Sequence, residues 1–391
     1  NTILYGPPGT GKTTTLIEAI VQLIKNGEKV LVSAPSNTAV DNIAKGLLQQ
    51  NIRLLRVGNA SKTDEAIFAH TPEGRLANSK QQKEIKQLKQ RAEEFRRMAL
   101  KYKRSFGKAE REQRQLLFKE VKNLRSEIKK LQAYNEEKLF EEAHEAGQCI
   151  EPLAWCIFPL ADKIVLAGDH WQLPPTVLSM EATKLGLNVS ILETAIQHTA
   201  IIHLLNTQYR MKEAIAGFSS CYFYNNQLLS PAQLANTGTH ITFIDTAGSG
   251  YNEEHGANGS SLQNPGELNI VIKLLQTEEL DAASTAFISP YSGQVAAAKE
   301  MLPKPIRIST IDSFQGQEKE NIILSLVRSN DDGDIGFLKD YRRMNVALTR
   351  AKEKLFVIGD SATIAADAFY HAFLTYMEQH GSYRTVWEFE M

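Results

Sequence analysis

Short apolar runs alternate with amphipathic stretches along most of this chain. An apolar run bounded by glycine, proline or small polar residues is typical of a buried strand, and apolar residues at helical spacing indicate a helix. The predicted strands are residues 3–5, 29–35, 163–167, a run that includes Leu204, 241–244, 285–289, 306–311, 321–326 and 355–358. The predicted helices are residues 14–25, a stretch that ends near Gln50, 267–276 and 342–350. Because strands that alternate with helices form parallel sheets, the sequence predicts an α/β fold.

The pattern changes between residues 79 and 138. This stretch is rich in Lys, Arg, Glu, Gln and Leu, contains no proline, and carries more basic than acidic residues. Apolar residues recur at helical spacing on both sides of Gly107, which predicts two long helices that turn near 105–107. We therefore expect a basic helical hairpin, an insertion over residues 79–143. A solvated spacer and a basic arm over a nucleic-acid groove are both compatible with it.

Composition narrows the possible functions only slightly. The chain has 391 residues, 42% of them hydrophobic, and a net charge of −1, so it has no general attraction to nucleic acid or to a membrane. Its three cysteines lack metal-site spacing and are interpreted as reduced thiols. No apolar run approaches 18 residues and no signal peptide opens the chain. We therefore expect no membrane contact and an intracellular location, cytoplasmic or nuclear.

The clearest chemical signal is a phosphate-binding loop at residues 6–13, with the pattern G-x-x-x-x-G-K-T between a predicted strand and a predicted helix. Its backbone N–H groups would surround the phosphates of a nucleotide, and the helix would aim its positive end at them. Lys12 would reach the β- and γ-phosphates, and the Thr13 hydroxyl would bind Mg²⁺. The predicted nucleotide-binding residues in this loop are Gly6, Pro7, Gly9, Thr10, Gly11, Lys12, Thr13 and Thr14.

Polar residues follow several of the other predicted strands. Gln172 suits a sensor of the γ-phosphate, because an amide can donate to phosphate and accept from water. Arg210 could act as an arginine finger, and Tyr209 could stack on a base. Taken singly, such residues are more often surface ion pairs or core aromatics. Residues 36–38 could contact phosphates, but a helix cap explains them equally well.

The segment 145–152 resembles a metal and water site, in which an apolar strand ends in Asp-Glu. Here Glu145 occupies the Glu position, but His144 occupies the Asp position, and residues 138–143 have a helical rather than a strand pattern. We hypothesise that the sequence omits residues close to His144. Alternatively, His144 replaces the Mg²⁺ ligand, and ATPase activity is then weakened.

Seven motifs in a fixed order resemble those of the superfamily 1 helicases of the 5′-to-3′ branch. This group contains the nonsense-mediated-decay helicase, the immunoglobulin mu-binding helicase and senataxin. The matching stretches are GPPGTGKTTT (6–15), SAPSNTAVDNIA (33–44), EAGQCIEP (145–152), GDHWQLPPT (168–176), QYRM (208–211), TIDSFQGQEKE (310–320) and NVALTRAK (345–352).

The resemblance implies two RecA-like parallel-sheet domains, residues 1–205 and 206–391, with ATP between them. It implies that Glu145 is the general base, Gln172 the γ-phosphate sensor, and Arg210 and Arg350 the fingers. Tyr209 and Glu318 are implied to contact the nucleotide. The implied contacts with single-stranded DNA or RNA are Ser36, Asn37, Thr38, Pro174, Pro290 and Thr310.

The function implied is that of an ATP-dependent helicase or translocase, which we expect to be a monomer. The alternatives are a nucleic-acid-stimulated ATPase clamp or remodeller that does not unwind, and an inactive nucleic-acid-binding scaffold. A GTPase is disfavoured because the sequence has no Asn-Lys-x-Asp. The family usually carries a small β-barrel upstream, so we also expect a segment before residue 1.

Overall fold

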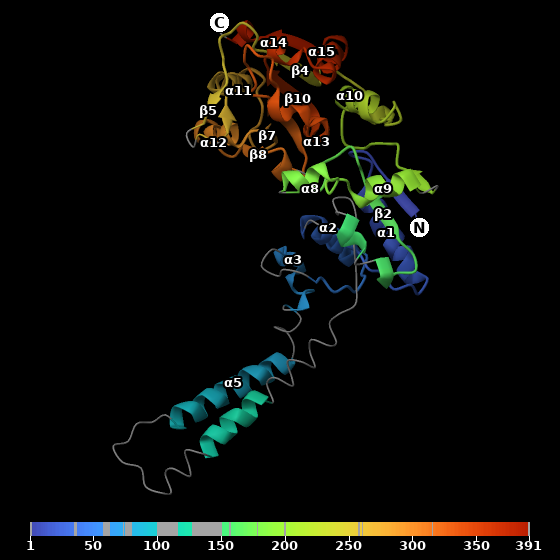
Figure 1. Ribbon diagram of the computed structural model, residues 1–391, viewed down its shortest axis with the longest axis vertical. Helices are drawn as coiled ribbons and strands as arrows, with labels where there is room; N and C mark the ends of the chain where they lie inside the picture. The colour runs from blue at the N-terminus through green and yellow to red at the C-terminus, as the bar shows by residue number, and fades with distance from the viewer. Residues whose placement is uncertain are drawn as a thin grey trace, which may run out of the picture. The chain divides into compact units, whose positions relative to one another are not determined.

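The computed structural model (Figure 1) describes residues 2–34, 37–57, 63–72, 74, 80–99, 116–126, 151–155, 158–177, 179–198, 201–256, 259, 261–314 and 316–389. The chain divides into two compact units. Residues 1–12 and 146–391 form one, called here the sheet unit, and residues 13–145 form the other, called the helical unit. Each is described by itself.

A three-stranded parallel sheet carries the start of the chain. β1 (Thr2–Tyr5) lies between β2 (Val165–Gly168) and β3 (Ile202–Leu204), so the first strand pairs with segments from far along the sequence. Helix α9 (Ile191–His198) packs on this sheet, and α7 (Glu151–Trp155) contributes Ala154 to the same apolar core. The strand patterns at 3–5, 163–167 and Leu204 are thereby confirmed.

A second sheet has six parallel strands in the order β11-β4-β10-β9-β7-β8. The strands are β4 (Ile241–Asp245), β7 (Thr285–Ser289), β8 (Arg307–Thr310), β9 (Lys319–Ser325), β10 (Ala351–Gly359) and β11 (Ser382–Thr385). All except β11 were predicted from their apolar runs. The three-stranded sheet ends before residue 205 and the six-stranded sheet begins after residue 206, but the division into domains at that point stays a prediction.

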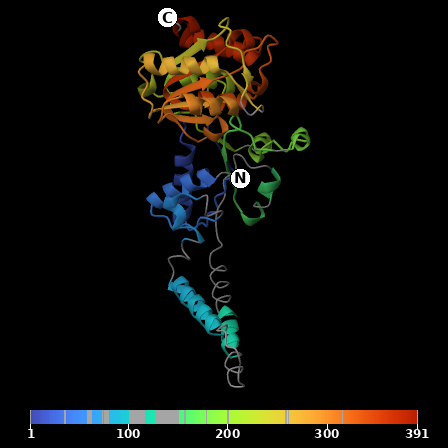
Figure 2. The ribbon, with the colours of Figure 1, turned by 90° about the vertical axis from the view of Figure 1, so that its left-hand side faces the viewer.

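Both faces of the second sheet are buried, which explains why its strands are continuously apolar. In β4, Phe243 belongs to one core and the next residue, Ile244, to the other. Helices cover both faces (Figure 2). The first core includes residues of α10 (Glu213–Phe223), α13 (Tyr341–Leu348), α14 (Ser361–Ile364) and α15 (Ala368–His380), and the second those of α11 (Pro265–Thr277) and α12 (Ser292–Met301).

Short elements connect these layers. They are α8 (Met180–Lys184), the β5 (Glu254–His255) and β6 (Leu262–Gln263) hairpin, and the 3₁₀ turns η2 (Phe158–Leu160), η3 (Ala232–Leu234), η4 (Asp312–Phe314), η5 (Gly336–Lys339) and η6 (Val386–Phe389). Among the helices of the described ranges, none is long and apolar enough to cross a membrane.

The helical unit contains most of α1 (Lys12–Lys25), together with α2 (Asn37–Gln49), α3 (Glu65–Phe68), α5 (Lys80–Ala99) and helical residues 116–126. Its core joins α1 to α2 through Ile20, Val21, Ile43, Ala44 and Leu47. The predicted turn at 105–107 lies outside the described residues, so the hairpin stays a prediction although both flanking stretches contain helix.

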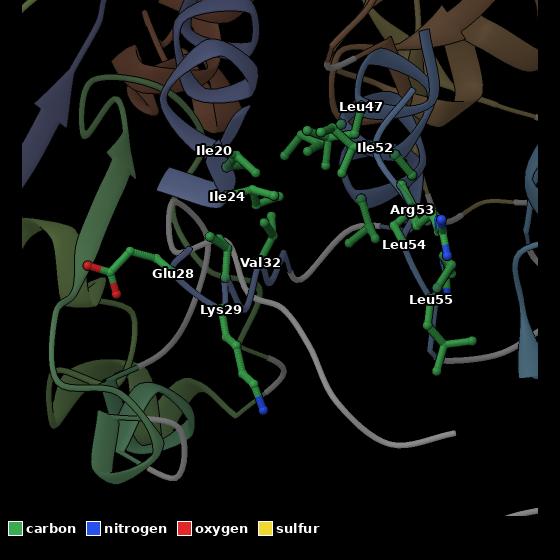
Figure 3. A pocket seen from close by; sticks show the side chains of 15 residues that line it. Ile20, Ile24, Glu28, Lys29, Val32, Leu47, Ile52, Arg53, Leu54 and Leu55 are labelled. Carbon is green, nitrogen blue, oxygen red and sulfur yellow. The ribbon is translucent and has the colours of Figure 1, made fainter. Parts of the chain in front are cut away.

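The predicted strand at 29–35 is wrong, because residues 28–34 adopt no regular structure. A strand requires a neighbour for its backbone N–H and C=O groups, and the described part of the helical unit contains no other strand. The apolar side chains of Val30 and Val32 instead line a hollow of about 170 Å³ (Figure 3), together with Ile20, Ile24 and Leu47.

A fully buried carboxyl group, Glu267, connects α11 to the end of β9. Both of its oxygens accept from the Val327 backbone N–H, at 3.0 and 3.1 Å, and one also accepts from the Ser325 hydroxyl. Ser325 in turn accepts from the Gln294 amide of α12 at 2.8 Å. Burial raises the pKa of Glu267 to about 8, against hydrogen bonds that lower it.

This raised pKa predicts a pH-dependent loss of stability. The folded state keeps a proton that the unfolded state releases, so the free energy of unfolding falls as the pH rises from about 4.5 to about 8. Glu267→Gln removes this loss, because a glutamine has no proton to release and its amide oxygen can still accept from the Val327 N–H. The melting temperature of the variant relative to the wild type should therefore improve between pH 5 and pH 8. Thermal unfolding across this range checks it, and a difference that does not change with pH would contradict it.

Candidate functional site

The phosphate loop follows β1 directly and is held by its own backbone. Gly6 N–H donates to the Gly168 carbonyl at 3.1 Å, which continues the pairing of β1 with β2. The Thr10 hydroxyl donates to the Pro7 carbonyl at 2.8 Å, and Lys12 donates to the carbonyls of Gly6 and Pro7. Lys12 begins α1, as the motif predicts. Its ammonium group thus occupies the centre of the loop, where a phosphate would replace carbonyl oxygens as its partner.

The loop touches the QYRM segment at Gly9. The Gly9 carbonyl accepts from the Tyr209 N–H at 2.9 Å. A Cβ at Gly9 would lie 2.9 Å from the Arg210 Cβ, and its φ of +76° also favours glycine. Gln208, fully buried, fixes this segment by accepting from the N–H groups of Arg210 and Met211 at 2.9 and 2.8 Å. Gly9 therefore allows Arg210 to come close to the phosphate loop.

Arg210 and Glu318, both predicted nucleotide contacts, form an ion pair with each other. Arg210 Nε lies 2.5 Å from a Glu318 oxygen, and its Nη1 donates to the Thr349 carbonyl at 3.1 Å. Lys352 binds the other Glu318 oxygen at 3.2 Å. The pKa of Glu318 is lowered, since burial, which acts to raise it, is outweighed by Arg210 and Lys352. To act on a phosphate, Arg210 must exchange this carboxylate for the new anion.

Arg350 is a buried cation, with 2% of its surface exposed. It donates to the carbonyl oxygens of Val346 and Gln317 at 2.8 and 3.4 Å and to the Thr349 hydroxyl at 3.1 Å, all neutral acceptors. Burial, and next the charge of Arg210, lower its pKa to about 9. Both arginines donate to Thr349, so two positive charges lie close to the same residue. Such a site favours an added anion.

Gln172 belongs to a polar network that joins the two sheets of the sheet unit. Its amide donates to Asp169 at 2.7 Å, and the Tyr224 hydroxyl donates to the same carboxylate at 2.7 Å. Asn345, one turn before Thr349 on α13, donates to Tyr224 at 2.9 Å and to the Trp171 carbonyl at 2.8 Å. Burial and Asp169 raise the pKa of Tyr224 well above its usual value, so this hydroxyl stays a donor.

The remaining predicted residues are less directly connected. Thr13 and Thr14 are exposed at the start of α1, within the helical unit. Asn37 accepts from Arg56 at 2.7 Å, which is a structural partner, while Thr38 is exposed. Pro174, Pro290 and Thr310 are half-buried in the sheet unit. Ser36, His144 and Glu145 lie outside the described residues, so the hypothesis of an omission there stays a hypothesis.

Sequence reasoning missed Asp169, Tyr224, Asn345 and Lys352, which hold the predicted residues in place. Asp169, Asn345 and Lys352 lie inside quoted motifs, so the signal was present but no role was assigned to them. Tyr224 lies within an aromatic run, Tyr222 to Tyr224, that looks like ordinary core. Its contact with Asp169 depends on the fold.

Two family models, each described as an AAA domain, match the chain in succession. One matches residues 187–362, and the other matches residues 1–144 and 145–180. The second match is divided between His144 and Glu145, where the motif departs from the metal-site pattern.

Curated relatives match nearly the whole chain. DNA-binding protein SMUBP-2 of Rattus norvegicus is 35% identical over 445 residues, covering 99% of this chain and 44% of the relative. DNA polymerase alpha-associated DNA helicase A of Schizosaccharomyces pombe is 32% identical over 432 residues, 97% of this chain and 64% of the relative. Regulator of nonsense transcripts 1 of Dictyostelium discoideum is 30% identical, over 96% of this chain and 31% of the relative.

The chain thus spans between 31% and 64% of the length of these relatives. The alignments with the rat and yeast proteins are longer than the 391 residues of the chain, so the relatives carry residues that have no counterpart here. Similarity to these relatives along nearly the whole chain, together with the two successive AAA-domain matches, shows that the chain belongs to the superfamily 1 helicases.

Proposed function

We propose that this protein is an ATP-dependent helicase or translocase that moves 5′ to 3′ along single-stranded nucleic acid. One observation carries the proposal: Arg210, whose backbone lies against Gly9 of the phosphate loop, and Arg350 both donate to Thr349, in the part of the chain that bears the six-stranded sheet. When one sheet carries the phosphate loop and the other supplies the cations, hydrolysis depends on the relative position of the two sheets. Such a dependence couples a nucleotide cycle to movement.

In this proposal each group of the site has a role. Lys12 and the backbone of residues 6–11 hold the β- and γ-phosphates, and Gln172 orients the attacking water at the γ-phosphate. Arg350, whose charge lacks a carboxylate among its hydrogen-bond partners, and Arg210, once it leaves Glu318, stabilise the developing negative charge. Tyr209, 64% exposed, is free to stack on the base, and Glu318 contacts the nucleotide.

The exposed Thr13 hydroxyl at the start of α1 fits a Mg²⁺ ligand, and Glu145 is the proposed general base. Bound Mg²⁺ would neutralise phosphate charge. The proposed strand contacts are Ser36, Asn37, Thr38, Pro174, Pro290 and Thr310. The insertion at 79–143 would modulate the grip on DNA or RNA. We also propose that the protein is a monomer with an intracellular location, cytoplasmic or nuclear. Its proposed domains are residues 1–205 and 206–391.

Two other functions differ from this one in measurable ways. A clamp or remodeller would hydrolyse ATP in response to a strand without separating a duplex. An inactive scaffold would bind a strand without turnover. The scaffold is disfavoured by Lys12, Glu145, Gln172, Arg210 and Arg350, because binding alone does not need their charges and amide. Only His144, at the Asp position, favours it.

The test measures ATP turnover by the full chain with and without single-stranded DNA or RNA, and unwinding of a duplex that has a 5′ overhang. We expect either strand type to raise the turnover and the 5′-tailed duplex to be unwound. A blunt duplex and a 3′-tailed duplex are the controls. Stimulation without unwinding would indicate the clamp, and no stimulation by either strand would overturn the proposal.

Lys12→Ala should abolish ATP turnover, because the loop loses the ammonium group that reaches its carbonyl oxygens. Nucleotide affinity, measured with a fluorescent ATP analogue, should fall as well. Thr38→Ala, which alters an exposed residue outside the loop, should retain analogue binding. Turnover that persists in Lys12→Ala would show that the loop does not bind the reacting phosphate.

Arg350→Ala should retain ATP binding but lose turnover by about 10³-fold or more, as expected for an arginine finger. Removing a buried cation that has neutral partners leaves no unpaired charge behind, so folding should survive. Arg384→Ala is the matched control, since Arg384 lies on the edge strand β11 and pairs with Glu278 and Glu388. Equal turnover of the two variants would refute the finger role.

A further inference from the structure

The short turn η5 presents an aromatic ring to solvent. Phe337 is 63% exposed, although Ile335 and Leu338 on either side are buried. Among the described residues between Met301 and Trp387, it is the one large apolar side chain that is exposed. Charged residues lie close to it in the sequence, Asp334 three positions before and Lys339 two positions after. An isolated ring among charges does not form the extended apolar patch that a protein interface needs.

The turn fixes this ring in place. The Phe337 N–H donates to the Tyr291 hydroxyl at 3.3 Å, and the centroids of the two rings lie 5.7 Å apart. Gly336 has a φ of +49°, and a Cβ there would lie 2.1 Å from Arg328 Nη1 and 2.9 Å from the Tyr291 hydroxyl. The Leu338 carbonyl accepts from Tyr370 at 2.9 Å. The exposure of Phe337 is therefore built into the fold and is not the result of a loose loop.

The other end of η5 borders a hollow of about 470 Å³. Lys339 lines it together with Trp171, Pro174, Tyr341 and Arg342. Arg342 also forms an ion pair with Glu193 of α9. The turn thus extends from Tyr291, next to Pro290, at one end to the hollow beside Pro174 at the other. One end of η5 thus contacts the residue after Pro290, and the other end lines the same hollow as Pro174.

We propose that Phe337 is a stacking platform for one base of the single strand. This inference rests on the proposed function, and it adds a residue that none of the seven motifs contains. A flat exposed ring accepts any base, so its contribution is independent of sequence. Asp331 and Asp332 are exposed in the preceding loop, while Lys339 is exposed on the following side. The phosphates flanking the stacked base therefore lie toward Lys339.

The experiment measures binding of a fluorescein-labelled oligo-dT to the full chain by anisotropy. Phe337→Ala should weaken binding on the order of 10-fold, the expected loss for one stacked base. Phe337→Trp should restore the affinity, and Phe337→Leu, which is apolar but not flat, should not. Trp387→Ala, which removes another exposed aromatic ring at 53% exposure, is the matched control and should bind like the wild type.

A second arm uses the same oligonucleotide with abasic sites throughout. The wild type and Phe337→Ala should bind this strand equally, since it has nothing to stack. An equal loss on both strands would mean that the substitution acts through structure, and equal affinity of all variants for oligo-dT would overturn the platform. If the wild type binds no strand at all, the proposed function itself fails, so the two failures are distinguishable.

Discussion

The close approach of Gly9 to Tyr209 and Arg210 is the constraint on which the rest of the site depends. Two backbones separated by about two hundred residues meet at one hydrogen bond of 2.9 Å, and a side chain at Gly9 would prevent it. This contact brings the phosphate loop at the end of one sheet to a segment that leads into the other. Glu318, Thr349 and Arg350 are then reached through Arg210, so one backbone contact connects the nucleotide loop to both arginines.

The charges of the two arginines in the site are also compensated unequally. Arg210 has a carboxylate partner, whereas Arg350 is buried among neutral acceptors, and each arginine donates to Thr349. Bringing a phosphate to this place would satisfy charges that the protein alone leaves poorly compensated. The Asp169–Tyr224–Asn345 network joins the same helix α13 to the loop after β2. A shift of Gln172 toward a ligand would therefore change the hydrogen bonds that hold α13, the helix that precedes Arg350.

The six-stranded sheet shows how far local pattern can predict structure. Its strands carry buried side chains on both faces, so their apolar runs are long and their positions follow from the sequence alone. Residues 29–35 have an equally apolar run, but the described part of it, residues 29–34, forms no strand, because pairing depends on a neighbour that the local sequence does not specify. The edge strand β11, with residues Tyr383 and Arg384, was not predicted because its pattern is polar. It has a neighbouring strand to pair with but no apolar run to reveal it.

The sequence by itself determined the phosphate loop, the order of the motifs and the family, because these depend on residue types at short spacing. It also identified Gln172, Arg210, Glu318 and Arg350 as candidates. Only the tertiary structure decided that Arg210 pairs with Glu318, that Asn37 binds Arg56, and that Asp169 joins Tyr224 to Gln172. Only the tertiary structure shows that Phe337 is exposed on a rigid turn. These are contacts between residues distant in the chain, and their energies depend on burial and distance, which no local pattern encodes.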